Sequence, residues 1–250
     1  MRLARFVYRK KVYWGKLQTD GIILLRSEPF SKIALSSRKI AHSAVKLLAP
    51  CSPSKIILIG LNYRDHAREL RMKIPHEPII FLKPNTAVIG PGESIIYPRG
   101  VKRLDYEAEL AVVIKKKAKA VPRSQALKCV LGFTCLNDVT ARDLQKRDGQ
   151  WTRAKSFDSF CPIGPWLETN LELKTTAVRL YLNGKLRQNS STANFIFPLD
   201  YIISFVSRVM KLLPGDVIST GTPLGVGAMK RGDLVEVDIE GLGRLENRVI

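Results

Sequence analysis

Short apolar runs separated by turn residues predict more strands than helices in this chain. Three of them open the sequence, "RFVYR", "VYWGKL" and "GIILLR", with basic residues or a Thr-Asp-Gly turn between them. Further runs predict strands in the rest of the chain: "KIILIG", "IIFLKP", "AVIGPGESIIYP", "ELAVVI", "GDVIST" and "DLVEVDIEGLGRLENRVI". The segment "VRLYLNGKLRQ" predicts a hairpin, because its Asn183-Gly184 pair suits a type I′ turn.

Helical patterns are fewer. "NYRDHARELRM" predicts a helix that ends before "KIPHEP", "PRSQALKCVLGF" a helix that opens with proline, and "GFTCLNDVTARDLQ" a strand that leads into a helix. "SSRKIAHSAVKLLAP" predicts a short helix or a connector. Asp200 is placed to cap a helix through "YIISFVSRVMKLL", which Pro214-Gly215 ends. Because strands and helices do not alternate strictly, a doubly wound sheet or an eightfold barrel is not expected. We predict a mixed α/β fold that is predominantly β.

The segment "PCSPS" at residues 50–54 has the composition of a linker. It predicts a small β-rich N-terminal domain over residues 1–53 and a larger domain over 54–250, for which 45% hydrophobic content provides a core. No run of about 18 apolar residues would span a membrane. Basic residues also interrupt the apolar runs of "MRLARFVYRKKVYWGK", so it lacks the core of a signal peptide. We expect a soluble, cytoplasmic protein.

The charge balance is strongly basic, with 41 Lys and Arg against 22 Asp and Glu and a formal net charge of +19. This charge has three possible interpretations: the protein binds nucleic acid or an anionic membrane, it has an ordinary solvated basic surface, or it attracts an anionic substrate. The bases are spread from Arg2 to Arg248 without a nucleic-acid-binding motif, which favours the solvated surface. A non-catalytic, basic nucleic-acid-binding protein is the competing class of function. The four cysteines form no C-x-x-C pair and are expected to be buried small side chains, although a disulfide stays open.

Two glutamates precede the apolar part of "RLDYEAELAVVIKKK". Because side chains alternate along a strand, Glu107 and Glu109 share one face, about 7 Å apart. Both faces of the following run are apolar, which places these carboxylates at the rim of a core. Like charges there need a compensating cation or proton. A solvated strand edge is the alternative, and "LVEVDIE" shows how such a strand alternates.

A third carboxylate is available in "LNDVTARDLQ", where Asp138 lies at a predicted strand-to-helix junction. Its alternative role is a helix N-cap. Three carboxylates without His or Cys partners select a hard cation, so Mg²⁺, Mn²⁺ or Ca²⁺ would fit.

Six segments together resemble the fumarylacetoacetate hydrolase family: "GLNYRDHARE", "FLKP", "DYEAELAVVI", "NDVTARDLQ", "WTRAKSFDSFCPIGP" and "PGDVISTGTPLGVG". They follow the family's order from residue 60 to about residue 227. The family includes acylpyruvases, oxaloacetate decarboxylases and 2-hydroxyhepta-2,4-diene-1,7-dioate isomerases. The resemblance implies a β-sandwich roll like the family's C-terminal domain, a small N-terminal unit before it, and a homodimer.

The resemblance also implies roles for individual residues. Glu107, Glu109 and Asp138 would bind a divalent metal, Mg²⁺ or Mn²⁺, which chelates an anionic 2-oxo acid. The implied catalytic residues are His66, Glu69 and Lys155, and the implied substrate contacts are Arg142, Gln145, Thr192 and Thr222. His66 and Glu69 would form the family's His-Glu dyad, which activates water. From the residues alone, their i, i+3 spacing is also that of a surface contact.

We therefore expect a metal-dependent enzyme that cleaves a C–C bond of a 2-oxo or 2,4-dioxo acid. Hydrolysis and decarboxylation would both pass through a metal-bound enolate, whose charge Lys155 would offset. Isomerisation between enol and keto forms of a 2-hydroxydienedioate would use the same site for proton transfer alone. Leu61, Ala193 and Asn194 differ from the residues of many family members, so the resemblance does not name the substrate.

Overall fold

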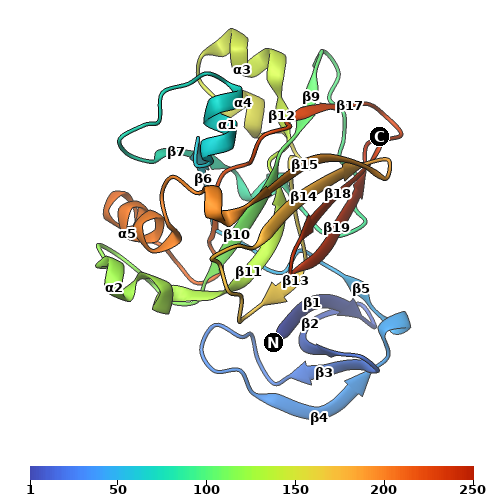
Figure 1. The fold of residues 1–250 in the computed structure, drawn as a ribbon. Coiled ribbons are helices and arrows are strands. Elements are labelled where there is room, and N and C mark those ends of the chain that lie inside the picture. The colour runs from blue at the N-terminus through green and yellow to red at the C-terminus, as the bar shows by residue number, and fades with distance from the viewer.

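The computed structural model describes residues 1–250 and consists mainly of strands, as the pattern predicts. The N-terminal strands form a lobe at one end of the molecule (Figure 1): β1 (Arg2–Tyr8), β2 (Lys11–Gln18), β3 (Gly21–Leu25), β4 (Leu35–Ile40) and β5 (Lys46–Leu47). The segment "SSRKIAHSAVKLLAP", expected to be a short helix or a connector, contains no α-helix: it holds the end of β4, a single 3-10 turn at His42–Ala44 and β5. β4 pairs antiparallel with β3, and this ladder buries Ile40 in the same small core as Ile22 and Phe6.

The largest sheet runs through the whole molecule in the order β4-β3-β2-β1-β13-β11-β10-β16-β6-β7, with β5 on β1 and β8 on β13. Its other strands are β6 (Ile56–Gly60), β7 (Ile79–Lys83), β8 (Val88–Ile89), β10 (Ala108–Ile114), β11 (Val130–Asn137), β13 (Cys161–Glu168) and β16 (Val217–Ser219). The long strand expected in "AVIGPGESIIYP" is reduced to β8, because Pro91-Gly92 turns the chain. The domain boundary at residue 53, between β5 and β6, stays a prediction.

Two smaller sheets complete the β structure. One has the order β15-β14-β18-β19, and the other the order β12-β9-β17. Their strands are β9 (Leu104–Tyr106), β12 (Thr140–Ala141), β14 (Ala177–Leu182), β15 (Lys185–Ser191), β17 (Gly227–Met229), β18 (Leu234–Ile239) and β19 (Gly243–Arg248). The β14–β15 turn has positive φ at Asn183 (53°) and Gly184 (73°), as the predicted type I′ turn requires.

The central strand β10 is buried on both faces, which explains its apolar residues on both sides. Leu110 and Val112 share a core with Leu180 and Val237 of the four-stranded sheet. On the other face, Ala111 and its neighbours pack in a second core. The large sheet and the four-stranded sheet thus form a β-sandwich around β10. The four cysteines are all buried and unpaired, as expected.

Five helices lie outside the sandwich: α1 (Arg64–Glu69), α2 (Arg123–Ala126), α3 (Arg142–Asp148), α4 (Thr152–Lys155) and α5 (Leu199–Val209). The capping role expected of Asp200 is wrong, since Pro198 is the N-cap residue of α5 and Asp200 pairs with Arg123 at 2.9 Å. None of the helices is long and apolar enough to cross a membrane. Helices α1, α3 and α4 gather at the end of the molecule opposite the N-terminal lobe, around the site described next (Figure 1).

Candidate active site

Three buried carboxylates meet at the ends of neighbouring strands. Glu107 lies between β9 and β10, Glu109 lies in β10, and Asp138 follows β11. The β10–β11 register pairs Ala108 with Asn137 and so brings Asp138 beside Glu107. One oxygen from each carboxylate lies within 4.8 Å of the others, and the three residues are only 6%, 2% and 0% exposed. The solvated strand edge considered for Glu107 and Glu109 is therefore wrong.

Two cations neutralise part of this cluster. Lys155, at the end of α4, donates hydrogen bonds to Glu107 Oε2 (3.0 Å) and Asp138 Oδ2 (2.5 Å). Arg142, at the start of α3, donates to Glu107 Oε1 through Nη2 and to Asp105 Oδ2 through Nε, the latter at 2.8 Å. Burial alone raises the pKa of Glu107, but attraction by Lys155 and Arg142 outweighs burial and lowers the pKa to about 2. Glu107 is thus ionised under physiological conditions.

Glu109 has no such cation. Its Oε2 accepts hydrogen bonds from the Ser219 hydroxyl and from the Gly221 N–H at 3.0 Å. Burial, followed by repulsion from Asp138 and Glu107, raises the pKa of Glu109 well above its usual value. Without a further positive charge the surroundings therefore favour the neutral form of Glu109, and a bound cation would favour its ionised form.

The residues fit a divalent cation. The donor set is three carboxylates without thiol or imidazole, which is the set that hard cations prefer. Asp138 Oδ1 is buried and accepts no hydrogen bond, although Lys83 Nζ lies 2.8 Å away. Lys83 instead donates to the carbonyl oxygens of Val139 (2.9 Å) and Phe160 (2.6 Å). A cation between the three residues would supply the counter-charge that Glu109 lacks, and a ligand for the Asp138 oxygen whose ion pair with Lys83 has no hydrogen-bond geometry.

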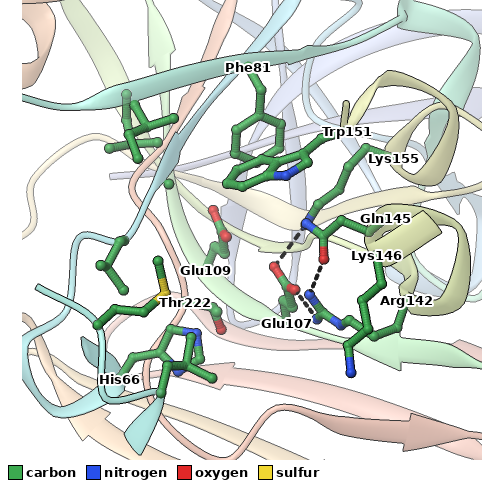
Figure 2. Close-up of a pocket in the computed structure, with 16 residues that line it drawn as sticks. His66, Phe81, Glu107, Glu109, Arg142, Gln145, Lys146, Trp151, Lys155 and Thr222 are labelled. Atoms are coloured by element: carbon green, nitrogen blue, oxygen red, sulfur yellow. Dashed lines mark hydrogen bonds and ion pairs between the residues drawn. The ribbon is translucent and has the colours of Figure 1, made fainter. Parts of the chain in front are cut away.

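A cavity of about 320 Å³ opens onto the carboxylates. Figure 2 shows Phe81 and Trp151 on one side of it, with their rings packed edge to face at a centroid distance of 5.0 Å. Glu107, Glu109 and Lys155 reach it from the strand and helix ends described above. Its volume suits a small organic acid rather than a polymer.

His66 lies at the same cavity and contacts Glu69. His66 Nδ1 is 2.8 Å from Glu69 Oε2, so the imidazole N–H donates to the carboxylate. Glu69 Oε1 also accepts the Gly225 N–H at 3.0 Å, which attaches α1 to the loop before β17. This pairing leaves His66 Nε2 as the ring nitrogen that can exchange a proton. His66, but not Glu69, lines the cavity beside the carboxylates.

The comparisons with known proteins agree with this arrangement. The family model "Fumarylacetoacetate (FAA) hydrolase C-terminal" matches residues 55–250. The chain belongs to the fumarylacetoacetate hydrolase family. A second model, "Rv2993c-like, N-terminal", matches residues 1–50. Family membership confirms the resemblance drawn from the six sequence segments.

Relatives within the fumarylacetoacetate hydrolase family cover most of this chain. A protein of Archaeoglobus fulgidus is 50% identical over 248 residues, 99% of this chain and 96% of its own. The mitochondrial oxaloacetate tautomerase Fahd2a of Rattus norvegicus is 42% identical over 223 residues, 84% of this chain and 71% of its own. The crystal structure of 5-carboxymethyl-2-hydroxymuconate delta-isomerase from Mycobacterium smegmatis superposes with a TM-score of 0.95 at 42% identity, covering 100% and 99% of the two chains.

Three of the four expected substrate contacts line the cavity of this family member. Arg142, Gln145 and Thr222 all face it, and Arg142 Nη1 donates to Gln145 Oε1 at 2.6 Å. The Thr222 hydroxyl accepts a hydrogen bond from Gln188 Nε2 at 3.0 Å, which fixes its position. Their contact with substrate stays a prediction.

Thr192 is placed elsewhere. Its hydroxyl donates to the Leu173 carbonyl oxygen at 2.5 Å and accepts the Thr176 N–H at 3.0 Å. Thr192 is buried and does not line the cavity, so its polar atoms hold the connection before β14. The structure does not bring it to the other site residues.

Four residues at the site received no role from the sequence. Lys83 and Phe81 belong to "FLKP" and Trp151 to "WTRAKSFDSFCPIGP", and these three residues contributed only to the family resemblance. Lys83 could have been noticed in the sequence because it ends an apolar strand run, and a lysine there is unusual if it is buried. In the structure it is 1% exposed. Lys146 follows Gln145 and lines the cavity, but nothing in the local sequence distinguishes it from the other bases.

Proposed function

We propose that this protein is a divalent-metal-dependent enzyme that moves a proton beside the keto group of a 2-oxo acid. It would interconvert keto and enol forms or shift a double bond of a 2-hydroxydienedioate. The observation that carries this proposal is one cavity lined by Glu107 and Glu109 of the carboxylate cluster and by His66, whose Nδ1 lies 2.8 Å from Glu69 Oε2. Two relatives support it, because they are named as a tautomerase and an isomerase, reactions that break no C–C bond.

Glu107, Glu109 and Asp138 would hold Mg²⁺ or Mn²⁺. Such a cation, when bound, supplies Lewis-acid polarisation of the carboxylate and keto oxygens of a 2-oxo acid, which acidifies the adjacent C–H. The protein's own contribution begins with Lys155. Burial lowers the pKa of Lys155, but Asp138 and Glu107 outweigh this effect and raise it, so the ammonium stays charged. Its positive charge offsets the negative charge that develops on the enolate oxygen.

His66 transfers the proton. Its Nδ1–H is held by Glu69, so Nε2 accepts the proton from the carbon next to the keto group. The Glu69 carboxylate stabilises the imidazolium that results. His66 then returns the proton to a different atom of the substrate, which completes the isomerisation. The apolar wall of Phe81 and Trp151 limits the access of water to the enol.

Hydrolytic cleavage of a 2,4-dioxo acid is the second candidate. His66 retains 13% of its side-chain exposure at the cavity, so a water molecule can reach Nε2 and be activated against the distal carbonyl carbon. Decarboxylation would need no base, and it has no such support. The competing hypothesis of a non-catalytic nucleic-acid-binding protein rests on the charge of +19 alone. The expected homodimer and cytoplasmic location stay predictions.

The test uses enol oxaloacetate and 5-carboxymethyl-2-hydroxymuconate, each with Mg²⁺, with Mn²⁺ and with EDTA. Loss of the enol absorbance gives the rate, and proton NMR in D₂O detects exchange at the carbon beside the keto group. We expect metal-dependent isomerisation and deuterium incorporation without cleavage products. Cleavage products that accumulate as fast as the isomer would favour the hydrolase, and turnover that EDTA leaves intact would refute the proposal.

A further inference from the structure

We propose that Lys146 makes this enzyme selective for 2-oxo acids with a second, distal carboxylate. This inference rests on the proposed function and extends it by naming the residue that distinguishes 2-oxo dicarboxylates from 2-oxo monocarboxylates. Lys146 lies on α3, one helical turn after Arg142, so the two bases occupy the same face of the helix.

A second cavity, of about 370 Å³, adjoins the first. Both are lined by the same five residues: His66, Leu70, Arg142, Gln145 and Lys146. The space beside the metal-binding carboxylates therefore continues past Lys146 toward the surface. Figure 2 shows Lys146 next to Arg142, on the side of the cavity opposite His66 in this view. A substrate held at the carboxylate cluster has room to extend in this direction.

Lys146 is the only base lining either cavity that has no acidic partner. Lys155 pairs with Glu107 and Asp138, and Arg142 pairs with Asp105 and Glu107. Arg103 pairs with Asp105 at 2.8 Å, and His66 pairs with Glu69 at 2.8 Å. No carboxylate oxygen lies within 4.0 Å of Lys146 Nζ. An anionic group that enters from outside is the partner that this ammonium lacks.

The charges around the two cavities indicate the charge of that ligand. With His66 neutral, five carboxylates are balanced by five bases: Glu69, Asp105, Glu107, Glu109 and Asp138 against Lys83, Arg103, Arg142, Lys146 and Lys155. A bound divalent cation therefore leaves two positive charges, which a dianion neutralises. One anionic group of that ligand faces the cation. The unpaired Lys146 fixes the place of the other.

Binding of two stable acids tests the proposal without requiring turnover. 2-Oxoglutarate and 2-oxopentanoate have the same chain length and differ only in a carboxylate against a methyl group at the far end. Calorimetry on the Mg²⁺-loaded protein compares their dissociation constants in wild type, Lys146→Gln and Arg147→Gln. Arg147 is the matched control, because it is exposed, neighbours Lys146 and lines neither cavity.

We expect wild type to prefer 2-oxoglutarate by about tenfold or more, and Lys146→Gln to lose most of this preference with unchanged 2-oxopentanoate binding. Arg147→Gln should retain the preference. A preference that survives in Lys146→Gln, an equal loss in Arg147→Gln, or no preference in wild type would overturn the role of Lys146. If the preference behaves as expected but no 2-oxo acid is isomerised, the proposed reaction fails and the inference about Lys146 stands.

Discussion

Replacement of Glu109 by glutamine should abolish metal binding without destabilising the metal-free protein. Without a cation, the neutral form of Glu109 is favoured, because burial and the charges of Asp138 and Glu107 raise its pKa well above its usual value. Glutamine has nearly the same shape as that neutral acid. Its oxygen can accept the hydrogen bonds from Ser219 and Gly221. We expect Glu109→Gln to change the unfolding free energy of the metal-free protein by less than about 1 kcal/mol.

The metal response should disappear in the same variant. A ligand that binds only the folded state at about 100 times its dissociation constant adds about 2.7 kcal/mol to the unfolding free energy. For a chain of this size that corresponds to an increase in Tm of about 5–11 °C. Wild type should show this shift with Mg²⁺ or Mn²⁺ and lose it in EDTA, whereas Glu109→Gln should show no shift.

The pH dependence has a definite sign. A carboxyl group whose pKa is raised in the folded state stabilises the metal-free fold below its unfolded pKa of about 4.5 and loses that contribution as the pH rises through the folded pKa. Metal-free wild type should therefore lose stability relative to Glu109→Gln as the pH rises above about 4.5. Metal affinity should increase over the same range, because the cation displaces a proton from Glu109.

The measurement is thermal unfolding of wild type, Glu109→Gln and Glu236→Gln, with metal and with EDTA, at several pH values. Glu236 is the matched control: it is a buried glutamate, 7% exposed, but it pairs with Arg244 at 2.8 Å in the four-stranded sheet. Its variant should keep the full metal shift. A metal shift retained by Glu109→Gln would refute the ligand assignment. A loss of more than about 3 kcal/mol in the metal-free variant would refute the neutral state of Glu109.

Three further substitutions test the remaining roles. His66→Gln should lower kcat by about 10²–10⁴-fold with unchanged Mg²⁺ affinity by calorimetry, and an unaltered kcat would exclude His66 as the base. Lys155→Met should lower the unfolding free energy in EDTA by about 3–5 kcal/mol, because Glu107 and Asp138 each lose one of two cations in a buried cluster and keep only Arg142 and Lys83 respectively. In wild type, the lowered pKa of Glu107 makes the unfolding free energy rise between pH 2 and 4.5. Lys155→Met should reduce this rise. A urea midpoint that matches wild type at each pH would contradict the expectation. Thr192→Val should cost about 1 kcal/mol of stability and leave KM unchanged, so a raised KM would restore Thr192 as a substrate contact.

The sequence by itself determined the features that depend on neighbouring residues. The Asn183-Gly184 turn followed from the positive φ that both residues tolerate. The side-chain alternation of β10 followed from its pleat, which sends Ala111 and Leu110 into different cores. The carboxylates Glu107 and Glu109 could be recognised as unusual because they precede a run that is apolar on both faces.

Tertiary structure decided everything that depends on chain segments far apart. β4 is a strand because β3 provides its hydrogen-bonding partner, which no local pattern records. Thr192 is withdrawn from the site because its hydroxyl bonds to atoms in the segment before β14. Lys83 reaches Asp138 from β7, and Glu109 lacks a cation that Glu107 has.

Lys146 shows most clearly that the sequence alone does not reveal which charged residues are paired. It is one of 41 bases in the sequence, and it becomes distinctive only when the other bases around the cavities are seen to be paired. Ion pairing between helices, strands and loops is a property of three-dimensional distance, since a Coulombic interaction depends on the separation of two charges and on the medium between them. The sequence therefore supplied the site's chemical groups, and the folded chain decided which charges remain for a substrate.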